Sequence, residues 1–216
     1  MKFIKIYSPQ RCGSNYLEWL LKNNFLHDWT LDEGNILGWK HGYPVSTIDW
    51  TASNWDSQPV PQEIKNKYLM KALPYKEIIQ KAFDENQIIY LICTRNPYSW
   101  IFNKVDLEGN IQKWNEKNEI LINFIKINNI NLIIKHEELI IDPLKVLIEI
   151  QSKFQLERAK NFTNLENTIA ARQTIKNETF DRTFFIEKKY IQKDKLPLIN
   201  KLLDESVMNF LDYKYE

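Results

Sequence analysis

The chain has 216 residues, of which 44% are hydrophobic and 26% are charged; this composition predicts one globular domain over residues 1–216 and excludes a disordered or fibrous protein. The 29 Lys and Arg residues against 28 Asp and Glu give a net charge of +1, which excludes the broad positive surface that nucleic-acid or membrane binding requires, so any anion site must be local. Two cysteines are too few for a disulfide framework or a four-thiolate zinc site. The sequence has neither a signal-peptide pattern nor a run of about 18 apolar residues, and we expect a soluble cytoplasmic protein.

The first predicted elements are a strand, a tight loop and a helix. Residues 3–7 form an apolar run that stops at a Ser-Pro turn, as a strand does. The next segment has leucines at the i, i+3 and i+4 spacing of a helix with one buried face, namely Leu17, Leu20 and Leu21. Residues 28–62 carry four tryptophans but no sustained period, and we predict an irregular region there.

Helical and strand patterns alternate through the rest of the chain. The apolar run IIYLICT at 88–94 suits a strand buried on both faces. The other predicted elements are helices at 75–85, 111–127 and 196–211 and a strand at 130–135. A further helix is predicted through about Phe154, with Asp142 as its N-cap and Pro143 in its first turn. Residues 155–195 are polar and give no clear pattern. The alternation predicts an α/β fold of three layers, with a central parallel sheet flanked by helices.

The loop SPQRCGSNY at 8–16 has the layout of an anion site. A tight loop that leads into a helix exposes unpaired backbone N–H groups at the positive end of the helix dipole. Gly13 lets the backbone approach an oxyanion, Ser14 and Asn15 add side-chain donors, and Arg11 adds a fixed charge. The loop is not a Walker A motif, because GxxxxGK[ST] is absent. The alternative interpretation is an ordinary capped turn.

A second cationic position follows the buried strand at 88–94. Arg95 comes directly after this apolar run, so it must emerge at the carboxyl edge of the sheet, where open α/β sheets bind ligands. That position suits a phosphate clamp. Taken alone, the Arg-Asn-Pro string also fits a surface arginine ahead of a proline turn.

These motifs resemble those of the P-loop sulfotransferases that use 3′-phosphoadenosine 5′-phosphosulfate (PAPS). The first family motif is a strand followed by Pro, a basic residue, a small residue, Gly, Ser or Thr and a polar residue. It is matched by Pro9, Arg11, Cys12, Gly13, Ser14 and Asn15, with Gln10 as one extra residue. The resemblance implies a P-loop fold in which residues 11–16, through Tyr16, hold the 5′-phosphosulfate, and Arg11 stabilises charge at the transferred group.

The second family motif implies a site for the 3′-phosphate of the nucleotide. Arg95, Asn96 and Pro97 match it, and the Ser expected eight residues after the Arg is replaced by Asn103, with Ser99 as a nearby substitute. Asn can still donate a hydrogen bond to phosphate. A third match, at 135–150, resembles a Tyr-Glu-Asp-Leu segment of the family with His136 and Glu138 in the Tyr and Asp places; we interpret it as architectural.

Sulfuryl transfer needs a base for the acceptor's proton and cations near the leaving group. We favour His41 as the base and Lys40 as the charge stabiliser, since the two are adjacent in GWKHGYP. A surface or structural role for His41 is the alternative, and an acidic residue from the middle of the chain is a further candidate. The family often has Lys, a spacer, His and Pro; at Lys71 the distance to Arg95 fits, but Leu73 replaces the histidine.

The predicted function is therefore transfer of a sulfuryl group from PAPS to a hydroxyl or amine of a small molecule or glycan. The sequence implies no metal, no nucleic-acid partner and no membrane partner. A P-loop kinase is the main alternative; it normally needs a loop lysine and an acidic metal partner at a strand end, where this chain has Arg95. A non-catalytic nucleotide-binding protein of the same fold is the second alternative.

Overall fold

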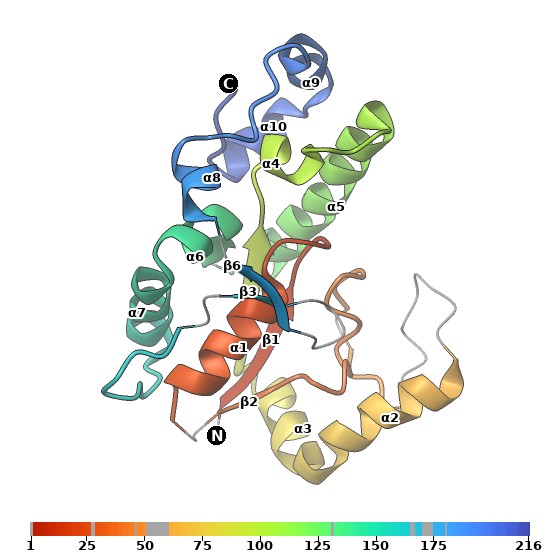
Figure 1. Ribbon diagram of the computed structural model, residues 1–216. Helices are drawn as coiled ribbons and strands as arrows, with labels where there is room; N and C mark the ends of the chain where they lie inside the picture. The colour runs from red at the N-terminus through yellow and green to blue at the C-terminus, as the bar shows by residue number, and fades with distance from the viewer. Residues whose placement is uncertain are drawn as a thin grey trace.

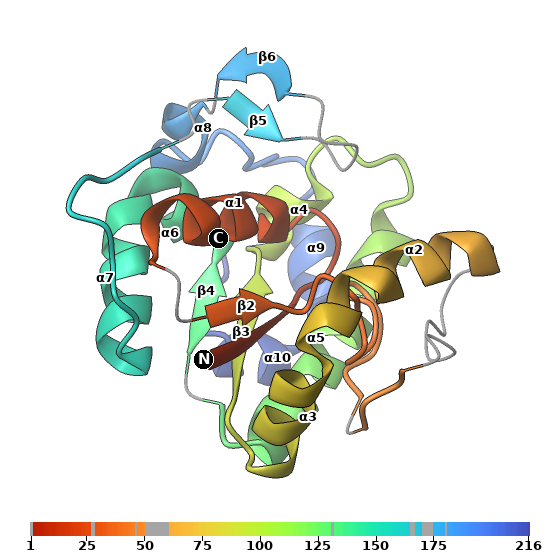
Figure 2. The same cartoon turned by 90° about the horizontal axis from the view of Figure 1, so that it is seen from below.

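A computed structural model describes residues 2–26, 29–45, 47–50, 61–130, 132–164, 167–169, 175–179 and 181–216. Its central sheet has four parallel strands in the order β2-β1-β3-β4. Figure 1 labels the first three of these strands, β1, β2 and β3. These strands are β1 (Lys2–Tyr7), β2 (Trp29–Leu31), β3 (Ile88–Thr94) and β4 (Ile133–Lys135). A separate antiparallel pair, β5 (Asn167–Ile169) and β6 (Ile175–Thr179), lies over the first helix (Figure 2).

Helices cover both faces of the central sheet. They are α1 (Ser14–Asn24), α2 (Gln62–Ala72), α3 (Lys76–Asp84), α4 (Pro97–Ile101), α5 (Leu107–Ile127), α6 (His136–Ile141), α7 (Pro143–Phe154), α8 (Arg182–Ile186), α9 (Leu196–Leu202) and α10 (Glu205–Phe210), with a 3-10 turn η1 (Leu73–Tyr75) between α2 and α3. Figure 2 shows α1 on one side of the sheet and α3 and α5 on the other. The three-layer α/β prediction is confirmed.

The alternation of side chains along β1 explains this layering. Ile4 and Ile6 are buried in the cluster that contains the α1 leucines, whereas Phe3 packs with α3 and Tyr7 packs with α5 on the opposite face. Successive side chains of a strand point to opposite faces, so β1 is buried on both sides. Lys5 lies between Phe3 and Tyr7 and is 1% exposed.

Most predicted elements are confirmed, with bounds shifted by a few residues. The helix predicted after an Asp142 N-cap is found at Pro143–Phe154, and the Asp142 carboxylate accepts a hydrogen bond from the backbone N–H of Lys145 at 3.0 Å, which confirms the cap. The predicted strand at 130–135 is shorter, Ile133–Lys135.

The prediction of a single helix at 196–211 is wrong. Leu203 is extended, with φ −69° and ψ 136°, and ends α9. Asp204 then accepts hydrogen bonds from the backbone N–H groups of Ser206 and Val207 at 2.8 and 3.0 Å and starts α10. The apolar spacing continues across a helix break because both helices pack against the same core.

The irregular region predicted at 28–62 contains β2, a strand of three residues that is too short to show alternation. His27 and Trp55 lie outside the described residues. Among the described helices, none combines the length and the apolar character that crossing a bilayer requires.

Candidate functional site

The site lies where β1 and β3 end side by side. The two strands pair in parallel, with Tyr7 opposite Ile92, so their carboxyl ends meet at one edge of the sheet. Arg11 lies four residues beyond Tyr7, and Arg95 lies three residues beyond Ile92. The parallel register therefore brings the two predicted cationic positions to one place.

The β1–α1 loop (residues 8–13) has the conformation of an anion cradle. Arg11 and Gly13 have φ values of +65° and +81°, which turn the chain sharply before α1. Gly13 is the N-cap of α1, no side chain caps the helix, and its first turn has no acidic residue. The first backbone N–H groups of a helix have no partner within the helix, so this end of α1 suits a negatively charged ligand.

Gly13 is also required by its neighbour His136. A Cβ atom at position 13 would lie 2.6 Å from Nδ1 of His136, which is a clash. His136 follows β4 and is buried. The segment at 135–150 thus closes against the loop, as expected of an architectural segment.

Hydrogen bonds to Ser99 and to the backbone of Arg11 hold the Arg95 side chain in place. Its Nε donates to Oγ of Ser99 at 3.0 Å, and Nη2 donates to the carbonyl of Ser99 at 3.0 Å. Nη1 donates to the backbone carbonyl of Arg11 at 3.1 Å. A guanidinium group carries further N–H donors on Nη1 and Nη2, so the fixed group can still bind an anion.

Glu137 is a site residue that the sequence interpretation left without a chemical role. Its Oε1 accepts hydrogen bonds from Oγ of Ser99 at 2.7 Å and from the backbone N–H of Asn96 at 3.1 Å. Burial raises the pKa of this carboxyl group, while the contacts with Ser99 and Arg95 oppose the rise. The topology offers a signal, because β4 is the neighbour of β3 and Glu137 follows β4 as Arg95 follows β3.

Two tryptophans fix the backbone of the two cationic segments. Nε1 of Trp100 donates to the carbonyl of Gln10 at 2.8 Å, and Nε1 of Trp114 donates to the carbonyl of Arg95 at 2.9 Å. Both rings belong to the main core. The core of the molecule thus sets the position of both strand-end loops.

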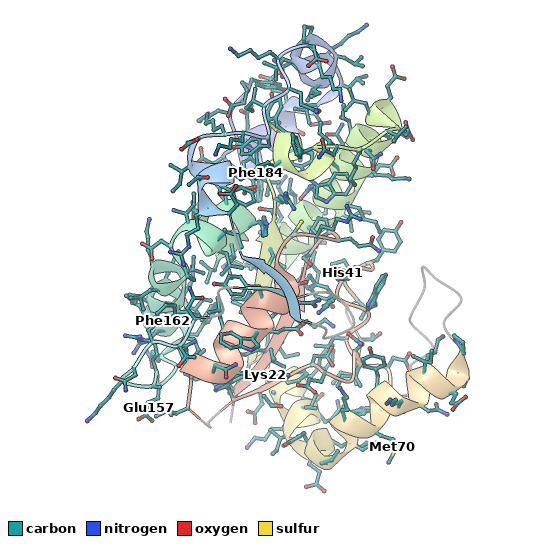
Figure 3. All side chains as sticks on the ribbon, in the orientation of Figure 1. Lys22, His41, Met70, Glu157, Phe162 and Phe184 are labelled. Atoms are coloured by element: carbon teal, nitrogen blue, oxygen red, sulfur yellow. The ribbon has the colours of Figure 1, made fainter. Side chains whose placement is uncertain are left out.

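The loop that follows β2 brings Lys40 and His41 into contact with Ser8, the first residue of the β1–α1 loop. The backbone N–H of Ser8 donates to the carbonyl of Lys40 at 2.9 Å, and Nδ1 of His41 lies 3.1 Å from the carbonyl oxygen of Ser8. Figure 3 labels His41 on the loop that follows β2. Lys40 forms an ion pair with Glu18 at 2.7 Å and donates to Oδ1 of Asn15. The structure therefore brings the predicted base to the predicted anion loop.

The surroundings of His41 define its tautomer and its charge. Nδ1 of His41 lies within reach of both the carbonyl and, at 3.2 Å, the hydroxyl of Ser8. A carbonyl oxygen can only accept a hydrogen bond, so the contact with it needs the proton on Nδ1 and leaves the lone pair on Nε2. The pKa of His41 is lowered to about 4, chiefly by burial; Lys40 and Lys5 add to the lowering, and the hydrogen bond to Ser8 opposes it. His41 is neutral at pH 7 and can accept a proton at Nε2.

Comparison with solved structures finds chains of similar fold, and two of them are sulfotransferase domains. The sulfotransferase domain from the curacin biosynthetic pathway matches with a TM-score of 0.54 at 14% identity, over 100% of this chain and 99% of that chain. The sulfotransferase domain from the Synechococcus PCC 7002 olefin synthase matches with a TM-score of 0.46 at 16% identity, over 93% of each chain. No family model and no curated protein sequence matches. The chain has a sulfotransferase-type fold.

Within this sulfotransferase-type fold, the remaining loop residues have defined positions. Cys12 is buried, and its thiol lies 3.7 Å from the carbonyl of Gln10; burial raises the pKa of this thiol well above its usual value, so it stays protonated. Ser14 is buried at the start of α1. The hydroxyl of Tyr16 donates to Oδ1 of Asn164.

The predicted substitutes for the family's second-motif serine differ in position. Ser99 is 2% exposed, and its hydroxyl contacts Arg95 and Glu137, so it orients Arg95 from within the protein. Asn103 is exposed and has a φ of +60°. In the described part of the chain it makes no hydrogen bond to Arg95.

The other candidate lysine and two of the tryptophans from the irregular region at 28–62 have defined contacts. Lys71 is on α2 and forms an ion pair with Glu33 at 3.5 Å. Trp39 packs edge-on against His41, with ring centroids 5.1 Å apart, and Trp50 donates a hydrogen bond to Gln80. A search of the described residues for three or more His, Cys, Asp or Glu side chains placed to hold a metal ion finds none.

Proposed function

We propose that this protein transfers a sulfuryl group from PAPS to a hydroxyl or amine acceptor. The observation that carries the proposal is the 3.1 Å hydrogen bond between the Arg95 guanidinium and the backbone of Arg11. It supports one continuous cationic site with two ends, which suits a nucleotide that is phosphorylated at both its 5′ and its 3′ position. The sulfotransferase-type fold supports the same function.

In this proposal the β1–α1 loop holds the 5′-phosphosulfate. The uncapped N-terminus of α1 supplies backbone donors, and Arg11 is exposed and supplies a positive charge. In the reaction the acceptor oxygen or nitrogen bonds to sulfur while the bond between sulfur and the bridging phosphate oxygen breaks. Arg11 would offset the negative charge that develops on that bridging oxygen.

His41 would take the acceptor's proton at Nε2. Its neutral state at pH 7 follows from burial and from nearby lysines, and a bound anion would raise the pKa of His41 because it would offset the charges of Lys40 and Lys5. Lys40 is shared with Glu18 and Asn15. Its proposed role is to fix Asn15 in the loop and to add a partly neutralised charge near the sulfate.

The proposal is tested first by ligand-induced thermal stabilisation. Adenosine 3′,5′-bisphosphate, the product of PAPS, should raise the melting temperature without Mg²⁺, since a ligand that binds only the native state stabilises it. A kinase of related architecture would respond to Mg-ATP instead. A mass-spectrometric screen of hydroxyl and amine acceptors with PAPS then measures transfer. Stabilisation by Mg-ATP and not by the bisphosphate would contradict the proposal.

A further inference from the structure

A tight turn after α4 explains why Asn occupies position 103. The backbone N–H of Lys104 donates to the carbonyl of Ile101 at 2.9 Å. Phe102 has φ −50° and ψ 130°, and Asn103 has φ +60°. These values define a type II turn, whose third residue needs a positive φ and favours Gly or Asn over Ser. The turn leaves the Asn103 side chain exposed and reverses the direction of the chain.

The reversal returns Lys104 toward the candidate site. Its ammonium group lies 3.3 Å from the centre of the Trp100 indole ring and donates to Oδ1 of Asn110 at 3.1 Å. The same indole donates to the carbonyl of Gln10, next to the residue whose carbonyl accepts from Arg95. Trp100 is therefore a platform that holds Lys104 beside the β1–α1 loop.

Arg11, Arg95 and Lys104 together form a cluster of like charge. Among the described residues, no carboxylate forms an ion pair with any of the three within 4.0 Å. The pKa of Lys104 is lowered to about 8, chiefly by burial and then by the charges of Arg11, Arg95 and Lys113, while Cys12 opposes the shift. The buried Glu137 carboxylate attracts Arg95 through the hydroxyl of Ser99, which both groups contact, and offsets part of the positive charge. Three cations that face one such carboxylate and form no direct ion pair are the arrangement expected of a site for a multiply charged anion.

We propose that Lys104 binds the 3′-phosphate of the nucleotide together with Arg95, and replaces the hydroxyl that the family places one residue earlier. The proposal rests on the function proposed above and adds a residue to it. Trp100 and Asn110 position the ammonium group, and the type II turn at Asn103 directs it inward.

Calorimetric titration with two nucleotides that differ only in the 3′-phosphate tests this role. The Lys104→Met variant should bind adenosine 3′,5′-bisphosphate about tenfold more weakly than the wild type, because one charge-assisted contact is lost. Its affinity for adenosine 5′-phosphate should be unchanged. The control is Lys145→Met, which removes an exposed lysine of α7 and should change neither affinity.

The pH dependence separates a charge contact from a packing effect. Between pH 7 and pH 9 the wild type should lose up to about tenfold in affinity for the bisphosphate, because Lys104 loses its proton in the free protein. Lys104→Arg, which stays protonated, should bind within about threefold of the wild type at pH 7 and keep that affinity at pH 9.

The titrations distinguish an error in the role of Lys104 from an error in the proposed function. Equal weakening of both nucleotides by Lys104→Met, or no weakening of either, would overturn the role of Lys104 while leaving the proposed function in place. A wild type that binds both nucleotides equally would instead contradict a 3′-phosphate site as a whole. If Lys104→Met does not fold, Lys104→Gln and the pH series with Lys104→Arg give the same decision.

Discussion

His41 is placed by the fold to act as a neutral base. Its Nδ1 faces the Ser8 carbonyl at 3.1 Å, and its neighbours Lys40 and Lys5 disfavour a second proton. A low pKa makes a histidine a weaker base but keeps it unprotonated over a wide pH range. The sequence pointed to this residue through the adjacent lysine, yet the lysine acts on His41 as a repelling charge.

This arrangement predicts an unusual pH profile. The ratio kcat/KM reports the pKa values of the free enzyme, so its acidic limb should lie near pH 4, where His41 gains a proton, and not near the ordinary histidine value of about 6.5. The measurement is kcat/KM for PAPS from pH 3.5 to pH 8. A limb near pH 6.5 would show that His41 is not the base or is not buried as described.

A His41→Asn variant provides the matching control. It should reduce turnover by about 10²-fold or more, the usual contribution of a general base, while adenosine 3′,5′-bisphosphate binds with wild-type affinity. Normal turnover in this variant would remove His41 from the mechanism.

The sequence points to Arg11 and Arg95 at the site but gives no role to Lys104, Glu137 or Glu18. Arg11 and Arg95 follow apolar strands directly, so the pattern itself locates them at the sheet edge. Glu137 and Glu18 lie within helices, and their roles depend on which strands and loops become neighbours. The pairing of β3 with β4 and the path of the loop after β2 determine these neighbours, and the local pattern of apolar residues shows neither.

The β1–α1 loop and the start of α6 act as one unit through Gly13 and His136. The loop needs a left-handed residue at position 13, and His136 occupies the space where its side chain would be. The positive φ at position 13 and the close approach of His136 are therefore two independent reasons for glycine at this position.

Gly13→Ala should destabilise the protein by about 1–3 kcal/mol, the sum of left-handed strain and the contact with His136. Urea unfolding measures the change. The double variant Gly13→Ala/His136→Ala is designed to separate the two contributions, because the contact disappears and the backbone strain remains. A Gly13→Ala protein as stable as the wild type would contradict the described loop conformation.

Elements with strong periodicity or a clear N-cap are predicted well from the sequence, whereas a very short strand and a break between two helices are not. The α1 leucines and the Asp142-Pro143 start of α7 are local signals, and both hold in the structure. The break between α9 and α10 is also local, at Asp204, but the continuous apolar spacing hid it. β2 has only three residues, and it forms through its parallel pairing with β1.

Across the whole molecule, a buried ion pair ties the sheet to the loop that carries His41. Nζ of Lys5 lies 2.7 Å from Oδ2 of Asp32, and the two side chains are 1% and 0% exposed. The Asp32 carboxylate also accepts from the backbone N–H groups of Ile36 and Leu37 at 3.0 and 3.1 Å. Lys5 donates in addition to the carbonyl of Gly38, two residues before Lys40.

Removal of one partner of this pair should be costly. Lys5→Met is expected to lower the free energy of unfolding by about 3–5 kcal/mol, because it leaves the Asp32 charge buried and unpaired. Lys22→Met, which breaks the exposed pair between Lys22 and Glu33, is the matched control and should cost about 0–1 kcal/mol. Similar losses for the two variants in urea unfolding would contradict a buried pair at Lys5.

The account as a whole depends on one nucleotide that bridges the ends of β1 and β3. Their pairing places Arg11 and Arg95 in contact through a 3.1 Å hydrogen bond. Each arginine should therefore affect a different end of the same ligand.

Calorimetric titration of the wild type, Arg11→Met and Arg95→Met with adenosine 3′,5′-bisphosphate and adenosine 5′-phosphate tests this most directly, with Arg158→Met as a control away from the site. We predict one nucleotide per chain, a loss of about 10–100-fold in the preference for the bisphosphate in Arg95→Met, and weaker binding of both nucleotides in Arg11→Met. Two bisphosphates per chain, or an unchanged preference in Arg95→Met, would contradict the account.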